Sequence, residues 1–414
     1  MKKLLVTEGF SDVFQEKTRR AFLWMNLSHE PFVVLYVLLP FILRKDLNAS
    51  ILQISVLSAL KPILPVFSFY WSANLTNRKN RLRSNLIGAW TLARLPFLLV
   101  PWINNVWYLI FCCAIYEFFN KSGIPALIEI LKINIHKGMR ESTYMLFFVL
   151  SFLESILLGI VISWALDWNP TLWQGLLGFA SLIGLSSIFF QLSVPIPIEP
   201  SEPLPKTDLM YRIVQPWKET FSLLRQHPNF ARFQYGFMLG GFSLMLIAPS
   251  LSIFYADFLE LSYSSVVIGR SVLMGLGIVI SSWMWKKILT KERVPELTQW
   301  ILLGFACYLL FMLFSQFHIS WFYISFFFYG IAQAGSHILW NLSGILFSDD
   351  ADSSPFSRLN ILMLGLRGAV APALGGVLCH FLGPIPTLII GTFICLIGIA
   401  YMKFSGVTQD VLSS

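Results

Sequence analysis

The sequence predicts an all-α membrane protein with about twelve transmembrane helices in two pseudo-symmetric six-helix bundles. Three observations lead to this fold class: an apolar composition, apolar stretches long enough to cross a membrane, and basic residues gathered in alternate loops. Of the 414 residues, 56% are hydrophobic and 13% are charged, whereas about a quarter of the residues of a soluble domain are charged. An aqueous fold has too little interior to hold this much apolar surface.

The apolar stretches are about 20 residues long, as a helix needs to be to cross about 30 Å of hydrocarbon. Many of them contain Pro and Gly, which membrane helices tolerate because neighbouring helices satisfy the freed backbone groups. The predicted spans are 21–43, 51–71, 84–102, 104–125, 143–165, 172–193, 232–255, 263–285, 297–315, 319–346, 358–381 and 384–403.

The cysteines and the N-terminus exclude several other readings. All five cysteines fall inside predicted spans and none forms a CxxC pair, so neither disulfides nor a metal site is predicted, and no cofactor is expected. The polar segment 1–20 runs directly into the first span without a small-residue cleavage site, so we expect no cleaved signal peptide.

The basic residues predict the orientation of the chain. Most of the 30 Lys and Arg residues lie in the N-terminal segment, in the loops that follow the second, fourth, sixth, eighth and tenth spans, and in the tail. Arg44 and Lys45 lie in the loop after the first span, on the opposite side. Because positive charge is retained on the cytoplasmic side, both termini are predicted to be cytoplasmic, in the inner membrane. The net charge of +8 therefore reflects topology, and no nucleic-acid partner is expected.

The chain divides into two related halves. The Pro-rich segment that starts at Pro195 predicts a linker over 194–230 between bundles at 1–193 and 231–414. At an offset of 214 residues, the loop 46–50 after the first span matches the loop 260–264 after the seventh, and Leu75-Thr76 matches Leu289-Thr290. Two matches in corresponding loops favour a duplicated six-span unit.

This layout resembles the major facilitator superfamily, whose signature Gly-x-x-x-Asp-Arg-x-Gly-Arg lies between spans two and three. The corresponding segment here, 73–81, keeps both arginines, Arg78 and Arg81, and has Asn77 in place of the aspartate. The resemblance implies that Asn77, Arg78 and Arg81 form a cytoplasmic gate. The same charges also fit a basic cytoplasmic turn.

A second pattern of that family, Gly-Pro-x-x-Gly-Gly, has a counterpart in span eleven, at Ala371-Pro372-Ala-Leu-Gly375-Gly376. Antiporters of the family carry it in span five, so its position weakens a drug-efflux reading. Close packing of helices through small residues is the alternative interpretation.

Ionisable side chains inside spans are costly and therefore indicate function. Polar residues spaced three or four apart share a helix face, and such stripes occur on spans one, four and ten, which line the central cavity in the resembled family. The predicted substrate-binding residues are Asn26, His29, Glu30, Glu117, Asn120, Lys121, Gln333, His337 and Asn341. The predicted proton-coupling or cavity charges are Lys61, Glu154, Arg270 and Arg367.

Other interpretations of these residues remain open. Glu117 and Lys121 could be an ion pair within one helix, and His337 could bond a neighbouring helix. Arg94 lies on a span that the family places at the periphery, which favours a structural role.

The function predicted is secondary active transport by alternating access of a small polar solute bound between the two halves. Basic residues outnumber acidic ones inside the spans, which favours an anionic or zwitterionic solute, and Glu30, Glu117 or Glu154 could carry a coupling proton. We expect a monomer in contact with membrane lipid. No nucleophile–base cluster or phosphate-binding loop is visible, so an enzyme is not expected. The alternatives are an efflux pump for lipophilic compounds and a non-transporting membrane sensor.

Overall fold

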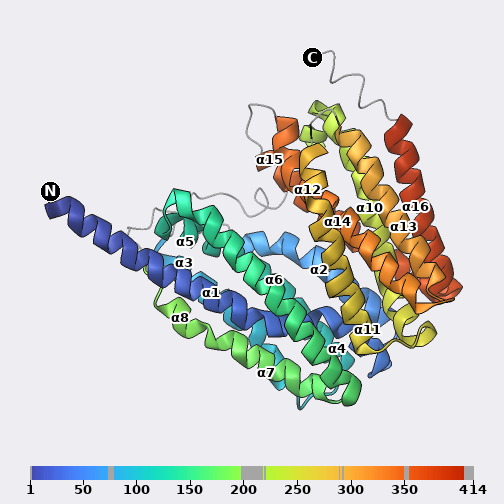
Figure 1. The fold of residues 1–414 in the computed structure, drawn as a ribbon, viewed down its shortest axis with the longest axis horizontal. Helices are drawn as coiled ribbons and strands as arrows, with labels where there is room; N and C mark the ends of the chain where they lie inside the picture. The colour runs from blue at the N-terminus through green and yellow to red at the C-terminus, as the bar shows by residue number, and fades with distance from the viewer. Residues whose placement is uncertain are drawn as a thin grey trace. The chain divides into compact units, whose positions relative to one another are not determined.

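The structure is a computed structural model that describes residues 2–72, 79–196, 218, 221–288, 290, 293–348 and 354–404. Every secondary-structure element of these residues is helical (Figure 1). Each of the twelve predicted spans overlaps a helix, which confirms the all-helical fold class. Eight helices of the described residues are long and apolar enough to cross a membrane, and Ile51–Phe67 is a shorter apolar helix. The chain is therefore a multi-pass membrane protein.

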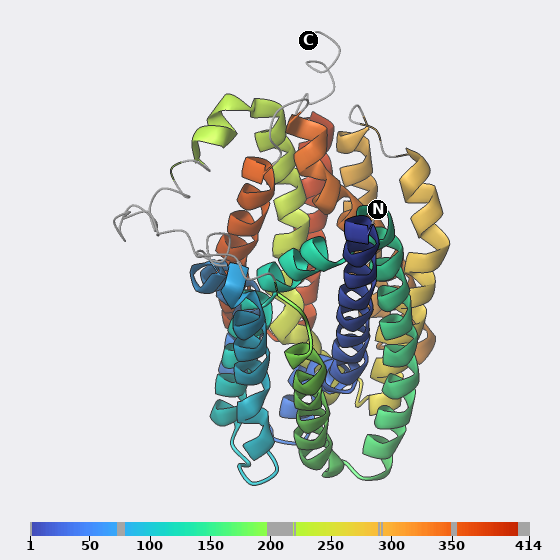
Figure 2. The same cartoon turned by 90° about the vertical axis from the view of Figure 1, so that its left-hand side faces the viewer.

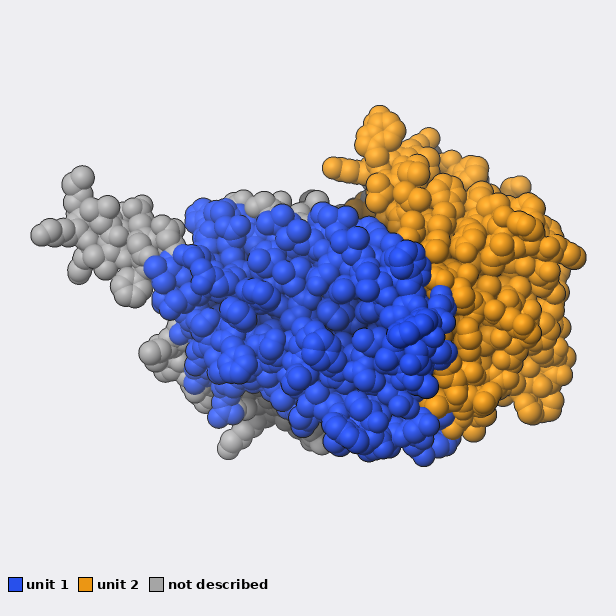
Figure 3. All heavy atoms as spheres, turned by 60° about the horizontal axis from the view of Figure 1, so that its bottom comes forward, with its two compact units in different colours: residues 1–39, 67–205 blue, residues 40–66, 206–414 orange. Residues whose placement is uncertain are grey.

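Two compact units make up the chain, residues 1–39 with 67–205 and residues 40–66 with 206–414 (Figure 3). We call them unit 1 and unit 2. The division into bundles at 1–193 and 231–414 stays a prediction, and residues 40–66 group with unit 2 rather than with their sequence neighbours. The predicted linker 194–230 falls largely outside the described residues.

Unit 1 is built from most of α1 (Lys2–Lys45) and the helices of the first half of the chain. These are α3 (Leu82–Arg94), η2 (Leu95–Leu99), α4 (Val106–Ser122), α5 (Ile124–Asn134), α6 (Lys137–Trp168), α7 (Leu172–Ser186) and α8 (Ile188–Leu192), preceded by the short η1 (Lys79–Arg81). A buried apolar cluster that includes Met25, Leu86 and Ile130 joins α1, α3 and α5. The sequence did not predict α5, which follows α4 after Gly123 and has Pro125 in its first turn.

Unit 2 contains the end of α1, the first part of α2 (Ile51–Ser72) and the remaining helices. These are α10 (Pro228–Ile253), η3 (Phe254–Phe258), α11 (Tyr263–Val267), η4 (Ile268–Leu273), α12 (Met274–Ile288), α13 (Val294–Phe314), α14 (Ile319–Ser348), α15 (Ser354–Leu382) and α16 (Pro384–Phe404). Helix α13 packs against α14 and α16, and α10 packs against α15 and α16 (Figures 1 and 2). A buried cluster that includes Phe233, Ile301 and Phe347 forms the core at these contacts.

Helix boundaries follow local chemistry. The side chain of Asn105 caps α4 by accepting a hydrogen bond from the Tyr108 backbone N–H at 3.1 Å, which satisfies one of the donors that a helix start leaves free. Helix α15 ends before Gly383, whose φ of 87° is a conformation that glycine adopts without strain. Pro384 then begins α16, at a position where its missing N–H costs nothing.

Glycines of α15 explain why residues 40–66 belong to unit 2. A Cβ at Gly368 would overlap Pro62, and a Cβ at Gly376 would overlap the Ser55 side chain, both on α2. A Cβ at Gly375 would overlap the backbone of α10 at Leu246. The two glycines of the Pro372-containing motif therefore lie at close helix contacts, as the packing interpretation predicted.

The two loops that the internal repeat aligned lie against each other in unit 2. Lys45 Nζ donates to the carbonyl oxygen of Leu261 at 2.7 Å, and the Tyr263 hydroxyl donates to the carboxylate of Asp46. Burial raises the pKa of Asp46, whereas the bond from Tyr263 and the charge of Lys45 act in the opposite direction. Contacts between chain segments so far apart fix the turn after α1 to the turn after η3.

Candidate functional site

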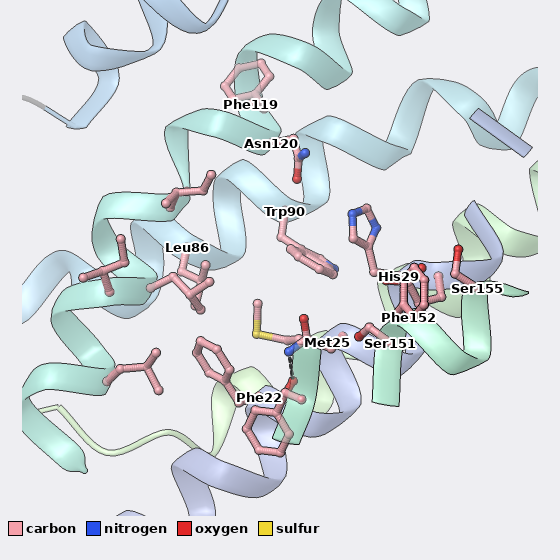
Figure 4. Close-up of a pocket in the computed structure, with 18 of the residues that line it drawn as sticks. Phe22, Met25, His29, Leu86, Trp90, Phe119, Asn120, Ser151, Phe152 and Ser155 are labelled. Carbon is pink, nitrogen blue, oxygen red and sulfur yellow. Dashed lines mark hydrogen bonds between the residues drawn. The ribbon is translucent and has the colours of Figure 1, made fainter. Parts of the chain in front are cut away.

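Unit 1 contains a cavity of about 890 Å³, large enough for a small organic solute. Apolar side chains make up most of its wall, among them Phe22, Met25 and Leu86. Its polar lining comes from α1, α3, α4, α5 and α6: Asn26, His29, Glu30, Trp90, Asn120, Lys132, Ser151 and Ser155. In Figure 4 the side chains of His29, Trp90 and Asn120 face the same space. The cavity thus joins an apolar wall to a few polar groups.

A buried arginine orients His29. Arg94, at 0% exposure, lies with its guanidinium Nη2 2.7 Å from His29 Nδ1, while its Nη1 donates to the Trp90 carbonyl at 3.1 Å. The guanidinium also stacks 3.5 Å from the centroid of the Trp90 ring. Because arginine only donates, His29 Nδ1 must be the acceptor, and the imidazole proton lies on Nε2.

The polar chain continues from His29 into α4. His29 Nε2 is 3.4 Å from the Tyr116 hydroxyl, which also accepts a hydrogen bond from Asn120 at 3.2 Å. These contacts bring together His29 and Asn120, two of the residues that the sequence predicted for the substrate site. Arg94 and Tyr116 were not predicted for the site, and the signal that could have found Arg94 is its charge at mid-span.

Two carboxyl groups, one on α1 that lines this cavity and one on α6 that does not, interact electrostatically. Glu30 lines it together with Ser151 and Ser155, and Glu154, between those serines on α6, interacts electrostatically with Glu30. Glu154 Oε2 is buried and, among the described residues, has no hydrogen-bond partner. Ser151 and Ser155 lie four residues apart on one helix, and this spacing is a sequence signal that places both hydroxyls on the same face.

The other predicted residues of unit 1 lie away from the cavity lining. Glu117 is 5% exposed and accepts a hydrogen bond from the Tyr36 hydroxyl at 2.8 Å, and Lys121 is exposed. Arg81 ends η1 and is exposed, while Asn77 and Arg78 fall outside the described residues.

Unit 2 contains a second cavity, of about 420 Å³. Lys61, Gln333, His337 and Arg367 line it, as do Ser58, Ser336 and the aromatic residues Phe237, Phe305, Tyr329 and Trp340. No Asp or Glu occurs among the described lining residues. Four predicted residues from α2, α14 and α15 are thus brought together in one cavity.

Two predicted residues of unit 2 do not line that cavity. Arg270, in the π-helical turn η4, is exposed and interacts electrostatically with Tyr255 and Tyr308. Asn341 is exposed, although its neighbour Trp340 lines the cavity.

The fold and the cavities define a class of protein: a multi-pass helical membrane protein with ionisable side chains buried among apolar ones, an arrangement typical of solute pathways. The family model for the Major Facilitator Superfamily matches residues 30–353. The chain therefore belongs to the major facilitator superfamily.

Solved structures of transporters share the fold. The nucleoside transporter NupG matches with a TM-score of 0.70 and 11% identity, over 94% of this chain and 98% of that chain. The peptide transporter POT in complex with sulfate matches with a TM-score of 0.69 and 13% identity, over 94% and 93%. A POT family transporter in complex with 5-aminolevulinic acid matches with a TM-score of 0.69 and 12% identity, over 97% and 96%. No curated protein matches the chain.

Proposed function

We propose that this protein is a secondary active transporter that moves a small polar solute, anionic or zwitterionic, across the cytoplasmic membrane by alternating access. The observation that carries the proposal is the pairing, in each unit, of a solute-sized cavity with ionisable side chains in its wall. Keeping such groups in a membrane is costly, so their presence in cavity walls favours a role in binding or coupling. The superfamily and its fold support transport in general.

Protons are the coupling ion that we propose, with Glu30 and Glu154 as the carriers. Their carboxyl groups are close enough to interact, and two neighbouring carboxylates in a region of low dielectric constant favour a shared proton. His29 fits this role less well. Its Nδ1 already accepts a hydrogen bond from Arg94, so a second proton on the ring requires that bond to break.

The test is uptake into proteoliposomes of labelled amino acids, organic acids, nucleotides and sugars, with an inward proton gradient and with the gradient collapsed. We expect Glu30→Gln and Glu154→Gln to abolish gradient-driven accumulation while solute exchange across the membrane persists. The control is Glu296→Gln, since Glu296 is an exposed carboxylate on α13 paired with Arg293. Accumulation that stays intact across pH in both variants would contradict proton coupling through these carboxyl groups.

A second candidate function is efflux of lipophilic compounds. The predominantly apolar wall of the unit 1 cavity, with Phe22, Phe147 and Phe152, favours it. Competition separates the two proposals, because displacement of a bound probe only by lipophilic cations supports efflux. A complete lack of flux with retained ligand binding supports the non-transporting sensor.

The distribution of basic residues supports a cytoplasmic location of both termini. Fusing a reporter that is active only in the cytoplasm to either end should give active fusions at both. We propose that the transporter acts as a monomer, which the mass of the purified protein–detergent complex tests.

A further inference from the structure

Arg367 on α15 reaches the unit 2 cavity through a gap that a glycine provides. A Cβ at Gly241 on α10 would overlap Arg367 Nη1, so the guanidinium in its present position occupies the space where a side chain at 241 would begin. The group lies 5.7 Å from the centroid of the Trp340 ring. The guanidinium of Arg367 on α15 therefore packs directly against the backbone of α10 at Gly241.

The hydrogen-bonding capacity of Arg367 is largely unused within the described residues. Its Nη1 lies 3.6 Å from the sulfur of Met238, a weak acceptor, and its buried Nε has no hydrogen-bond partner there. A guanidinium carries five N–H donors in a planar fork that matches an oxyanion. Burying such a group without a partner is costly, which indicates that a bound group completes it.

The residues that line the unit 2 cavity favour a negatively charged ligand. Lys61 and His337 line the same cavity and no described lining residue is acidic, so a cationic group would find no counter-charge there. Trp340 stacks on Phe237 with ring centroids 5.9 Å apart, and Phe305 and Leu244 extend the apolar wall. A cavity of about 420 Å³ suits one small molecule.

We infer that the unit 2 cavity binds a small organic anion, with its carboxylate on the guanidinium of Arg367 and its apolar or aromatic body against Trp340, Phe237 and Phe305. This inference rests on the proposed transport function and names the substrate class. Gly241 is a positioning residue, because it gives the guanidinium its place.

The test measures ligand-dependent thermal stabilisation of the purified full-length protein in detergent. The probes are phenylacetate, its neutral isostere phenylacetamide, and inorganic phosphate. We expect phenylacetate to stabilise the wild type and both other probes to have little effect. Equal stabilisation by phenylacetamide, stabilisation by inorganic phosphate alone, or no stabilisation by any probe would overturn the inference.

Variants locate the effect. Arg367→Gln is expected to weaken phenylacetate binding by on the order of tenfold or more, since hydrogen bonds to a charged group are lost. Arg367→Lys should recover part of the affinity because it keeps the charge without the fork. Gly241→Ala should weaken binding with the arginine still present. The matched control is Arg293→Gln, at an exposed arginine of the same unit, and it should bind as the wild type does. Unchanged affinity in Arg367→Gln would overturn the inference.

Transport is measured separately in proteoliposomes, so the two proposals fail in different ways. If a solute is taken up and Arg367→Gln does not change that uptake, the anion site is contradicted and the proposed transport function is kept. If an anion binds in an Arg367-dependent way but no solute is transported, the anion site is kept and the proposed transport function is contradicted.

Discussion

Adding one methyl group at Gly184 tests whether the buried Arg94 holds the unit 1 site together. Gly184 lies on α7, and a Cβ there would stand 2.5 Å from Arg94 Nε and 2.7 Å from Arg94 Cδ. The arginine must then retreat by about 1 Å to reach ordinary contact distance. Its guanidinium has little freedom to do so, since it is bonded to His29 and to the Trp90 carbonyl and stacks on the Trp90 ring.

The expected cost of Gly184→Ala has two parts. Overpacking a filled interior costs about 1–3 kcal/mol, and losing the charged hydrogen bond to His29 adds roughly 1.5–3 kcal/mol. We therefore expect the free energy of unfolding to fall by about 2.5–6 kcal/mol, or the unfolding midpoint to fall by roughly 3–7 °C for a protein of this size. His29 would also lose the partner that fixes its tautomer.

The assay follows thermal unfolding in detergent with a dye that reacts with thiols as they become accessible. Cys112 and Cys113 on α4 are buried and report on unit 1. The matched control is Gly175→Ala on the same helix, where an added Cβ meets no atom within 4 Å. This control should be neutral or slightly stabilising, because alanine is the better helix former.

A double-mutant cycle with Arg94→Ala assigns the effect to the arginine. In that background the clash is gone, so Gly184→Ala should become nearly neutral. The reasoning is refuted if Gly184→Ala unfolds at the same temperature as Gly175→Ala, or if its penalty persists without Arg94.

Two further predictions concern contacts within unit 2. Arg44 Nε lies 3.0 Å from each carboxylate oxygen of Asp257; we expect Arg44→Ala and Asp257→Ala each to cost roughly 1 kcal/mol and the double variant to cost little more, as measured by unfolding midpoints. Additive losses would show that the pair is not coupled. A Cβ at Gly330 on α14 would overlap the backbone oxygen of Met274 on α12, so Gly330→Ala should cost roughly 2 kcal/mol or more because a backbone atom cannot step aside. Gly88→Ala, which meets nothing within 4 Å, is its control, and equal unfolding midpoints of the two variants would contradict the close α12–α14 contact.

Hydrophobicity determined much of the fold from sequence alone. Each apolar stretch predicted a helix because a backbone in hydrocarbon must satisfy its own hydrogen bonds. The same rule says little about α5, whose 11 residues are too short to cross a membrane.

Helix-face spacing determined part of the candidate site. It placed Asn26 and Glu30 together because residues four apart on one helix share a face. It could not rank Glu117 against Asn120, since which face of α4 borders a cavity depends on the helices packed around it. In the structure, Asn120 lines the unit 1 cavity and Glu117 is buried against Tyr36.

Sequence by itself determined that this is a multi-pass helical protein with charged side chains inside its spans, because composition and periodicity are properties of each segment alone. Tertiary structure decided which side chains from different helices contact these charged groups. Arg94 joins His29, and Arg367 enters a cavity beside Trp340, because Gly184 and Gly241 on other helices leave room for them. Contacts of this kind depend on close approach between distant segments, which no local pattern records.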